Sequence, residues 1–242
     1  MSVPQIIMYK SPGRPWGMPD LSPFCAKLET YLRMAGWDYQ LAPVDFRRAP
    51  KGKVPYVAID GELLGDSQFI IETLEKRRTT ALDASLTLEQ RAQGHALRRM
   101  LDEGLYFVLV HERWSDDTGW KLYRPVFGTV MPAPLRLILP LIRRSVRKSL
   151  KAQGTGRHSA TEVTQMGIAD FNALSAVLGG RDYLLGNTPS TYDASAFAFI
   201  HGIAAVPHDS PLRRHLLGSK NLMHYRDRVL QRWFPELSGP AL

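Results

Sequence analysis

The sequence predicts an α/β domain followed by an all-α domain. Residues 5–78 alternate short apolar runs with helical patterns, in the order strand, helix, strand, strand, strand, helix. After a polar linker at 77–85, every segment has helical spacing. We therefore expect one domain over residues 1–80 and a second over residues 86–242.

The α/β part begins with a short buried strand at 5–9, followed by a loop rich in glycine and proline. A helix is expected over 24–35, where apolar residues form one stripe and Gly36 is placed to end it. A second strand is expected at 39–44. The helical crossover between these two strands makes them parallel neighbours.

Residues 54–64 have the pattern of a β-hairpin that turns at Asp60 and Gly61. Ser67 is expected to cap the next helix, which runs to residue 78. The residues expected to be buried in this helix are Phe69, Ile70, Ile71 and Leu74. A β-α-β unit followed by a hairpin and a helix is the thioredoxin-like arrangement.

The helical part contains three capping boxes, each of which marks the start of a helix. They pair Thr87 with Gln90, Ser159 with Glu162 and Ser190 with Asp193. Leucines recur at every fourth residue from Leu97 to Leu109, which predicts a long helix buried along one stripe. The last helix is expected around residues 222–233.

The composition limits the class of protein. The 242 residues are 44% hydrophobic and carry a formal net charge of +8. Cys25 is the only cysteine, which excludes a disulfide within the chain. With no signal peptide and no apolar run of ~20 residues, we expect a cytoplasmic protein. The basic residues lack an aromatic platform or a known binding motif, so nucleic-acid binding is not expected, and no metal site is expected.

The segment Ser22-Pro23-Phe24-Cys25 opens the first predicted helix. A helix N-terminus offers unpaired N–H groups and a positive dipole end, which favour a bound thiolate. Ser22 stands where a two-cysteine redox motif needs a cysteine, so exchange within such a motif is excluded. Its hydroxyl either donates to a thiolate brought by a ligand or only caps the helix. Tyr9, at the end of the first strand, is a second candidate hydroxyl.

Two further pairs suit a peptide-like ligand. Val54-Pro55 begins a strand and is a candidate cis peptide bond, which would turn the Val54 backbone toward the site. Asp66-Ser67 begins a helix, where Ser67 suits a carboxylate and Asp66 suits an ammonium group. Lys51 and Lys53 are placed to neutralise a second carboxylate. The simpler alternatives are a trans proline, an ordinary helix cap and a solvated lysine.

Taken together, these motifs resemble the soluble glutathione transferase superfamily over nearly the whole chain. The segments SPFCAKLETYLRMAGWDY, APKGKVPY and DSQFIIETLE are similar to its failed-axon-connections and metaxin-like branch, whose members are less uniformly enzymes. The resemblance implies the glutathione transferase fold, glutathione as co-substrate and a homodimer. It implies that Ser22 stabilises the thiolate of glutathione and that Val54, ahead of cis-Pro55, pairs with the cysteinyl backbone of glutathione. It also implies that Asp66 and Ser67 hold the γ-glutamyl end and that Lys53 lies near the glycyl carboxylate.

The acceptor pocket is expected to come from the helical half and from the loop after the first strand. The candidates are Trp16, Tyr106, His111, Arg113, Trp114 and Trp120. At helical spacing such residues also serve as packing between elements, and this alternative stays open.

The segment 132–151 combines apolar residues with many arginines and lysines. A membrane-surface helix has this composition, and so does a basic helix that packs on the protein. We expect packing and keep peripheral membrane contact as the alternative.

The function expected from this resemblance is attack of a bound glutathione thiolate on a small hydrophobic electrophile. The alternative is a non-catalytic adaptor or membrane-associated binding protein that keeps the fold. A third alternative is glutathione-dependent reduction through Cys25, although a buried thiol is the expected role of that residue.

Overall fold

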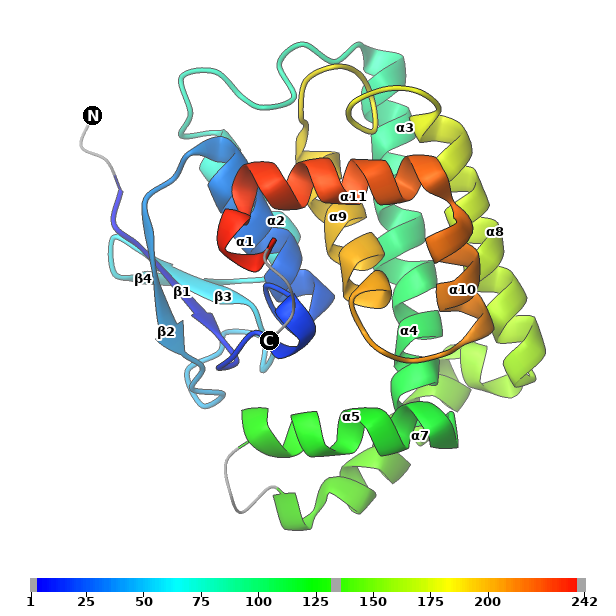
Figure 1. Cartoon of the computed structure of the whole chain (residues 1–242). Helices are drawn as coiled ribbons and strands as arrows, with labels where there is room; N and C mark the ends of the chain where they lie inside the picture. The colour runs from blue at the N-terminus through cyan, green and yellow to red at the C-terminus, as the bar shows by residue number, and fades with distance from the viewer. Residues whose placement is uncertain (1–3, 132–135, 239–242) are drawn as a thin grey trace.

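The computed structural model describes residues 4–131 and 136–238. A four-stranded sheet forms one side of the molecule, and helices form the other (Figure 1). The strand order is β2-β1-β3-β4, with β1 (Ile6–Lys10) parallel to β2 (Tyr39–Pro43) and antiparallel to β3 (Tyr56–Ile59). The hairpin of β3 and β4 (Glu62–Gly65) turns at Asp60 and Gly61, as predicted.

Helices α1 (Pro23–Ala35) and α2 (Ser67–Glu75) lie between the sheet and the helical half (Figure 1). Gly36 ends α1 in the left-handed conformation, with φ of 68°, as the sequence predicted. Three details of α2 differ from expectation. The helix ends at Glu75 rather than at residue 78. Asp66 is the capping residue and Ser67 is the first helical residue, and Phe69 is half exposed.

The helical half begins with one nearly continuous helix. It consists of α3 (Leu88–Arg99), a π-helical turn (Met100–Leu105) and α4 (Tyr106–Trp114). The remaining helices are α5 (Asp117–Val130), α7 (Leu139–Gln153), α8 (Ala160–Leu178), α9 (Thr191–Ala204), α10 (Pro211–Gly218) and α11 (Lys220–Trp233). All three predicted capping boxes are present, at the starts of α3, α8 and α9. The predicted fold class is therefore confirmed.

Helix α9 packs against α1 and joins the two halves into one hydrophobic core. The carboxylate of Asp193 is fully buried at its start, where it accepts hydrogen bonds from the Ser190 and Leu184 N–H groups and the Tyr225 hydroxyl. A buried carboxylate is tolerated because these donors replace water. The start of α9 is thereby fixed against the last helix.

The chain segment after α11 is fastened to α1. Arg14 and Arg33 both pair with Glu236, at 3.2 Å and 2.7 Å, and both also pair with the buried Glu29 of α1, at 2.7 Å and 3.1 Å. The loop between β1 and α1 is therefore held between α1 and the last described residues.

Helices α5 and α7 form a pair at one end of the molecule (Figure 1). A second, smaller core holds this pair in place; its buried members are Met18, Leu21, Trp120, Tyr123, Phe127, Leu139 and Val206. Among the described helices, we find none whose length and apolar composition would carry it through a bilayer.

Candidate functional site

A cleft of about 720 Å³ lies between the α/β part and the long helix α3–α4. Its first wall consists of Ser22, Phe24, Phe46, residues 51–55, residues 66–69 and Glu72, and its second wall consists of Arg98, Arg99, Asp102, Glu103, Tyr106 and Phe107. The fold thus brings together Ser22, Lys53, Val54, Pro55, Asp66, Ser67 and Tyr106, which the sequence singled out separately.

Ser22 lies at the N-terminus of α1, where the cleft meets the unpaired N–H groups of the first turn. Its Oγ accepts from the Cys25 N–H at 3.4 Å, which is a long hydrogen bond. The hydroxyl keeps its own proton free to donate while it accepts this bond. Capping and donation to a ligand are therefore compatible at this residue.

The backbone that leads into Ser22 is fixed from three sides. The Asp20 carboxylate accepts from the Ser22 N–H at 2.7 Å, and the Lys10 ammonium donates to the Pro19 carbonyl. The Arg113 guanidinium donates to the Leu21 carbonyl at 2.7 Å. Burial raises the pKa of Asp20 to about 6, and the neighbouring Lys10 partly opposes this rise.

The Val54–Pro55 peptide bond is cis, which confirms the candidate bond named from the sequence. Strand β3 begins only at Tyr56, so the backbone of Val54 lies outside the sheet ladder and on the wall of the cleft. Lys53 precedes it on the same wall. A backbone segment of this kind can pair with a short extended peptide.

Asp66 caps α2, where its Oδ1 accepts from the N–H groups of Gln68 at 2.9 Å and Phe69 at 3.4 Å. Its φ is 84°, a conformation that costs energy for a residue with a side chain. Lys51 lies 3.8 Å from the second oxygen of Asp66 and 4.3 Å from the Phe69 ring centre. Ser67 is buried beside this cap, so carboxylate, ammonium and hydroxyl groups converge on one end of the cleft.

The second wall carries charged residues that the sequence interpretation missed. Asp102 pairs with Lys27 of α1 at 2.8 Å and with Arg98 at 3.4 Å, and its Oδ1 is buried without a partner among the described residues. Burial lowers the pKa of Lys27, and Asp102 opposes that effect. The spacing of Arg98 and Asp102, four residues apart beside the leucine stripe, was the available signal.

Aromatic residues form the apolar part of the cleft. Phe24 lies 4.9 Å from Tyr106 between ring centres, and Tyr106 lies 5.1 Å from Phe107. Burial raises the pKa of Tyr106, so its hydroxyl is protonated at neutral pH. This end of the cleft suits an apolar group, whereas the end near Asp66 suits a charged one.

The structure places Tyr9 away from the cleft. Met8 and Lys10 point from β1 toward α1, so Tyr9 between them points to the opposite face of the sheet. There its ring stacks on Tyr56, with ring centres 4.5 Å apart. The expectation that Tyr9 points toward the region of Ser22 is therefore corrected by the alternation of the strand.

Five residues expected in the acceptor pocket also lie outside the cleft wall; they are Trp16, His111, Arg113, Trp114 and Trp120. Trp16 packs edge-on against Tyr123, and Trp114 stacks on Phe127 at 4.2 Å. Arg113 is buried over the Tyr123 ring, and His111 is half-buried on α4. Trp16, Arg113 and Trp114 attach α5 to α4 and to the loop before α1, which is the packing alternative left open by their helical spacing.

Cys25 is fully buried, and burial raises the pKa of its thiol well above the usual value. The thiol is therefore neutral and inaccessible, in agreement with the expected role of a small buried residue. Within residues 4–131 and 136–238, we find no cluster of three or more histidine, cysteine or acidic residues arranged to hold a metal ion.

Comparison with known proteins identifies the family. Residues 23–119 match the glutathione S-transferase N-terminal domain, and residues 167–229 match the glutathione S-transferase C-terminal domain. The chain is 34% identical over 227 residues to isoprene-epoxide–glutathione S-transferase of Rhodococcus sp. (strain AD45), covering 90% of this chain and 95% of that protein.

Other relatives bear different names. The chain is 31% identical to Failed axon connections of Drosophila melanogaster, covering 90% of this chain and 56% of that protein. It is 30% identical to metaxin-3 of Xenopus laevis, covering 92% of this chain and 75% of that protein.

Solved structures give the same fold. A β-etherase of Sphingobium sp. strain SYK-6 superimposes with a TM-score of 0.61 at 18% identity, covering 96% of this chain and 98% of that chain. Glutathione S-transferase III in its apo form gives 0.60 at 16% identity, covering 98% and 99%. The family matches, together with the relative at 34% identity, show that this chain belongs to the glutathione S-transferase superfamily.

Proposed function

We propose that this protein is a glutathione transferase that adds the glutathione sulfur to a small hydrophobic electrophile. The observation that supports this proposal most directly is the convergence of Ser22, Val54 with cis-Pro55, and the Asp66–Ser67 cap on one cleft. A tripeptide with two carboxylates, an ammonium group and a thiol has a counterpart for each group there.

In this proposal the charged end of the cleft binds glutathione. Asp66 takes the γ-glutamyl ammonium, Ser67 takes the adjoining carboxylate, and Lys53 lies near the glycyl carboxylate. The N–H and carbonyl of Val54 pair with the cysteinyl residue as a short antiparallel strand. This pairing directs the thiol toward the N-terminus of α1.

The thiol then loses its proton to solvent, and the thiolate is stabilised by the Ser22 hydroxyl and the first-turn N–H groups of α1. The sulfur forms a bond to an electrophilic carbon in the apolar end near Phe24 and Tyr106. The bond from that carbon to its leaving oxygen or halogen breaks, and the leaving atom takes the electron pair. Because the relative from Rhodococcus is named for isoprene epoxide, small epoxides are the first electrophiles to test.

The decisive experiment measures the pKa of bound glutathione from thiolate absorbance. Ser22→Ala is expected to raise that pKa and to lower kcat, while costing about 1 kcal/mol of stability through the lost cap. Ser67→Ala is the matched control, which is expected to weaken glutathione binding without changing the thiol pKa. Tyr9→Phe is expected to change neither. If Ser22→Ala leaves both the pKa and the rate unaltered, the backbone N–H groups alone activate the thiol.

The second candidate function is a non-catalytic binding protein with this fold. It is favoured by the similarity to Failed axon connections and metaxin-3. Glutathione distinguishes the two, since a ligand stabilises the folded state by RT ln(1 + [L]/Kd). No thermal shift at millimolar glutathione would favour the binding protein. A homodimer is proposed in either case, and light scattering would test it.

A further inference from the structure

The pair of helices α5 and α7 carries an apolar tip that no described part of the chain covers. Leu137 is 86% exposed and Leu141 is 64% exposed, and they lie four residues apart. Leu139 and Leu150 of the same segment are buried against the protein. The packing expected for this basic segment is therefore only half realised, because one face packs inward and leucines remain on the other. Residues 132–135 lie outside the described residues.

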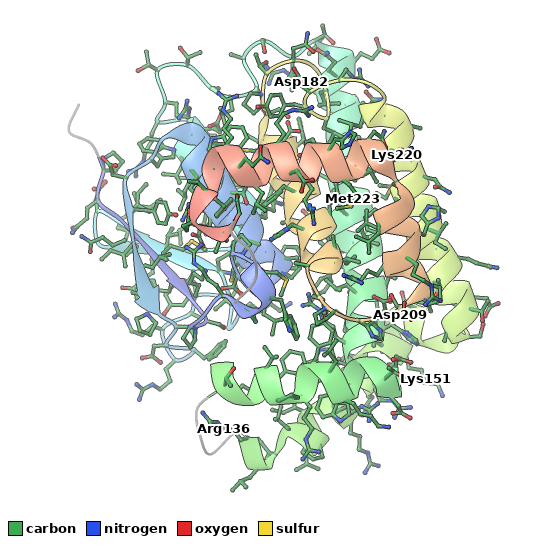
Figure 2. All side chains as sticks on the ribbon, in the orientation of Figure 1. Arg136, Lys151, Asp182, Asp209, Lys220 and Met223 are labelled. Atoms are coloured by element: carbon green, nitrogen blue, oxygen red, sulfur yellow. The ribbon has the colours of Figure 1, made fainter. Side chains whose placement is uncertain are left out.

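The same surface is strongly basic. Residues 136–151 contain six arginines and lysines and no carboxylate. Figure 2 labels Arg136 and Lys151 on this α5–α7 end of the molecule. Exposed leucines beside these cations form a surface that can bind an apolar phase and anions together.

Next to the leucines is a second cleft, of about 440 Å³, between α5 and α7. It is lined by Trp120, Arg124, Pro140, Arg143, Arg144 and Arg147. Arg143 is held in position by the carbonyls of Trp114 and Ser115 and by Asp117, and its guanidinium stacks on the Trp120 ring.

The other three arginines of this cleft, Arg124, Arg144 and Arg147, form no ion pair with any described residue and are exposed. Guanidinium groups bind phosphate oxygens with paired, charge-assisted hydrogen bonds. A cleft of this size with several unpaired guanidinium groups therefore suits a phosphate group that arrives from outside the chain.

We propose that the α5–α7 pair docks on an anionic phospholipid bilayer. The arginine cleft takes lipid phosphates, and Leu137 and Leu141 enter the boundary between headgroups and acyl chains. Charge complementarity selects this occupant over a second copy of the chain, because pairing two copies through this face would bring like charges together in a protein of net charge +8. The inference uses none of the residues of the glutathione cleft.

The test is flotation of the full chain with vesicles of phosphatidylcholine alone and of phosphatidylcholine mixed with phosphatidylserine. We expect binding to the mixed vesicles only, decreasing with salt. The triple variant Arg124→Ser, Arg144→Ser, Arg147→Ser is expected to bind roughly a hundredfold more weakly, since each cation near an anionic surface contributes about fivefold.

Two further variants distinguish docking through this surface from unspecific attraction between a basic protein and anionic vesicles. Leu137→Ser with Leu141→Ser keeps the charge and is expected to lose about tenfold or more. The matched control, Arg48→Ser, Lys76→Ser and Lys220→Ser, removes the same charge from exposed positions elsewhere and is expected to bind nearly as the wild type. Circular dichroism and thermal unfolding check that each variant is folded, and retention on immobilised glutathione should be the same for all.

Three results would overturn the proposal. The first is equal loss of binding in the arginine triple and in its control, which would mean unspecific attraction. The second is stabilisation by inorganic phosphate without binding to any vesicle, which would assign the cleft to a soluble anion. The third is a dimer that Leu141→Glu dissociates, which would assign the leucines to a second copy.

Discussion

Lys27 of α1 and Asp102 of the π-helical turn form an ion pair of 2.8 Å in which the two side chains are only 1% and 8% exposed. This pair connects the α/β part to the helical half, and Asp102 also belongs to the second wall of the cleft. A π-helical turn is uncommon and often occurs at functional sites. In this protein the π-helical turn carries Asp102, whose carboxylate contacts Lys27 of α1.

The buried pair predicts a large effect when one partner is removed. Asp102→Leu leaves the Lys27 ammonium buried without a carboxylate, and we expect the free energy of unfolding to fall by about 3–5 kcal/mol. The double variant Lys27→Met, Asp102→Leu should recover most of that loss, because the buried ammonium is removed as well and only Arg98, which is 12% exposed, loses a carboxylate partner. Urea unfolding at neutral pH measures both. An Asp102→Leu protein as stable as the wild type would show that water reaches Lys27.

The buried carboxyl group of Asp20 should stabilise the folded protein at acidic pH. Its pKa is raised from 3.8 to about 6 because burial penalises the carboxylate, so its contribution is fully present below pH 3.8 and is lost as the pH rises through 6. In Asp20→Asn this dependence disappears. The stability of the variant relative to the wild type should therefore rise by about 3 kcal/mol between pH 4 and pH 7. Denaturant unfolding over that range checks the slope, and a difference that does not change with pH would contradict it.

His201 predicts the opposite dependence. Burial lowers its pKa from 6.5 to about 4, while its Nε2 lies 3.0 Å from the Gly17 carbonyl oxygen. Its contribution is present above pH 6.5 and is lost as the pH falls toward 4. As the pH falls from 7 to 4, the wild type loses this contribution and His201→Gln does not. The free energy of unfolding of the variant, relative to that of the wild type, should therefore rise by about 3 kcal/mol. In the wild type the opposite pH dependences of Asp20 and His201 nearly cancel. Each dependence therefore becomes visible only when one of the two residues is replaced.

Two glycines of α5 offer a matched pair. A Cβ on Gly119 would overlap the carbonyl oxygen of Glu112 in α4, whereas a Cβ on Gly128 meets no atom within 4 Å. Gly119→Ala should cost about 1–3 kcal/mol through the forced shift between α4 and α5. Gly128→Ala should stabilise the protein by up to about 1 kcal/mol through helix propensity. Thermal unfolding of the two variants compares the same chemical change in crowded and open surroundings.

Phe69 illustrates where the sequence interpretation of the fold succeeded and where it failed. Periodicity identified α2 and its core residues Ile70, Ile71 and Leu74 correctly. Three consecutive apolar residues cannot all face inward on a helix, because each step turns the direction by about 100°. Phe69 therefore points out to the cleft, where Lys51 covers its ring.

The first wall of the cleft was predictable because its residues lie at element ends, where caps and prolines leave a sequence signature. The second wall was not. Arg98 and Asp102 look like any exposed ion pair on a helix, and only the tertiary fold places Lys27 against them. Arg113 and Trp114 were assigned to a substrate pocket because a stripe of large residues does not reveal which neighbour it meets.

The ion pairs of Arg14 and Arg33 with Glu236 have a consequence for biosynthesis. Arg14 and Glu236 are 222 positions apart in the chain, yet they form an ion pair beside Glu29 of α1. The contacts that hold the loop before α1 are therefore complete only after residue 236 has left the ribosome. A nascent chain would hold a nearly finished sheet for most of its synthesis, while Arg14 in the loop before α1 still lacked its partner Glu236.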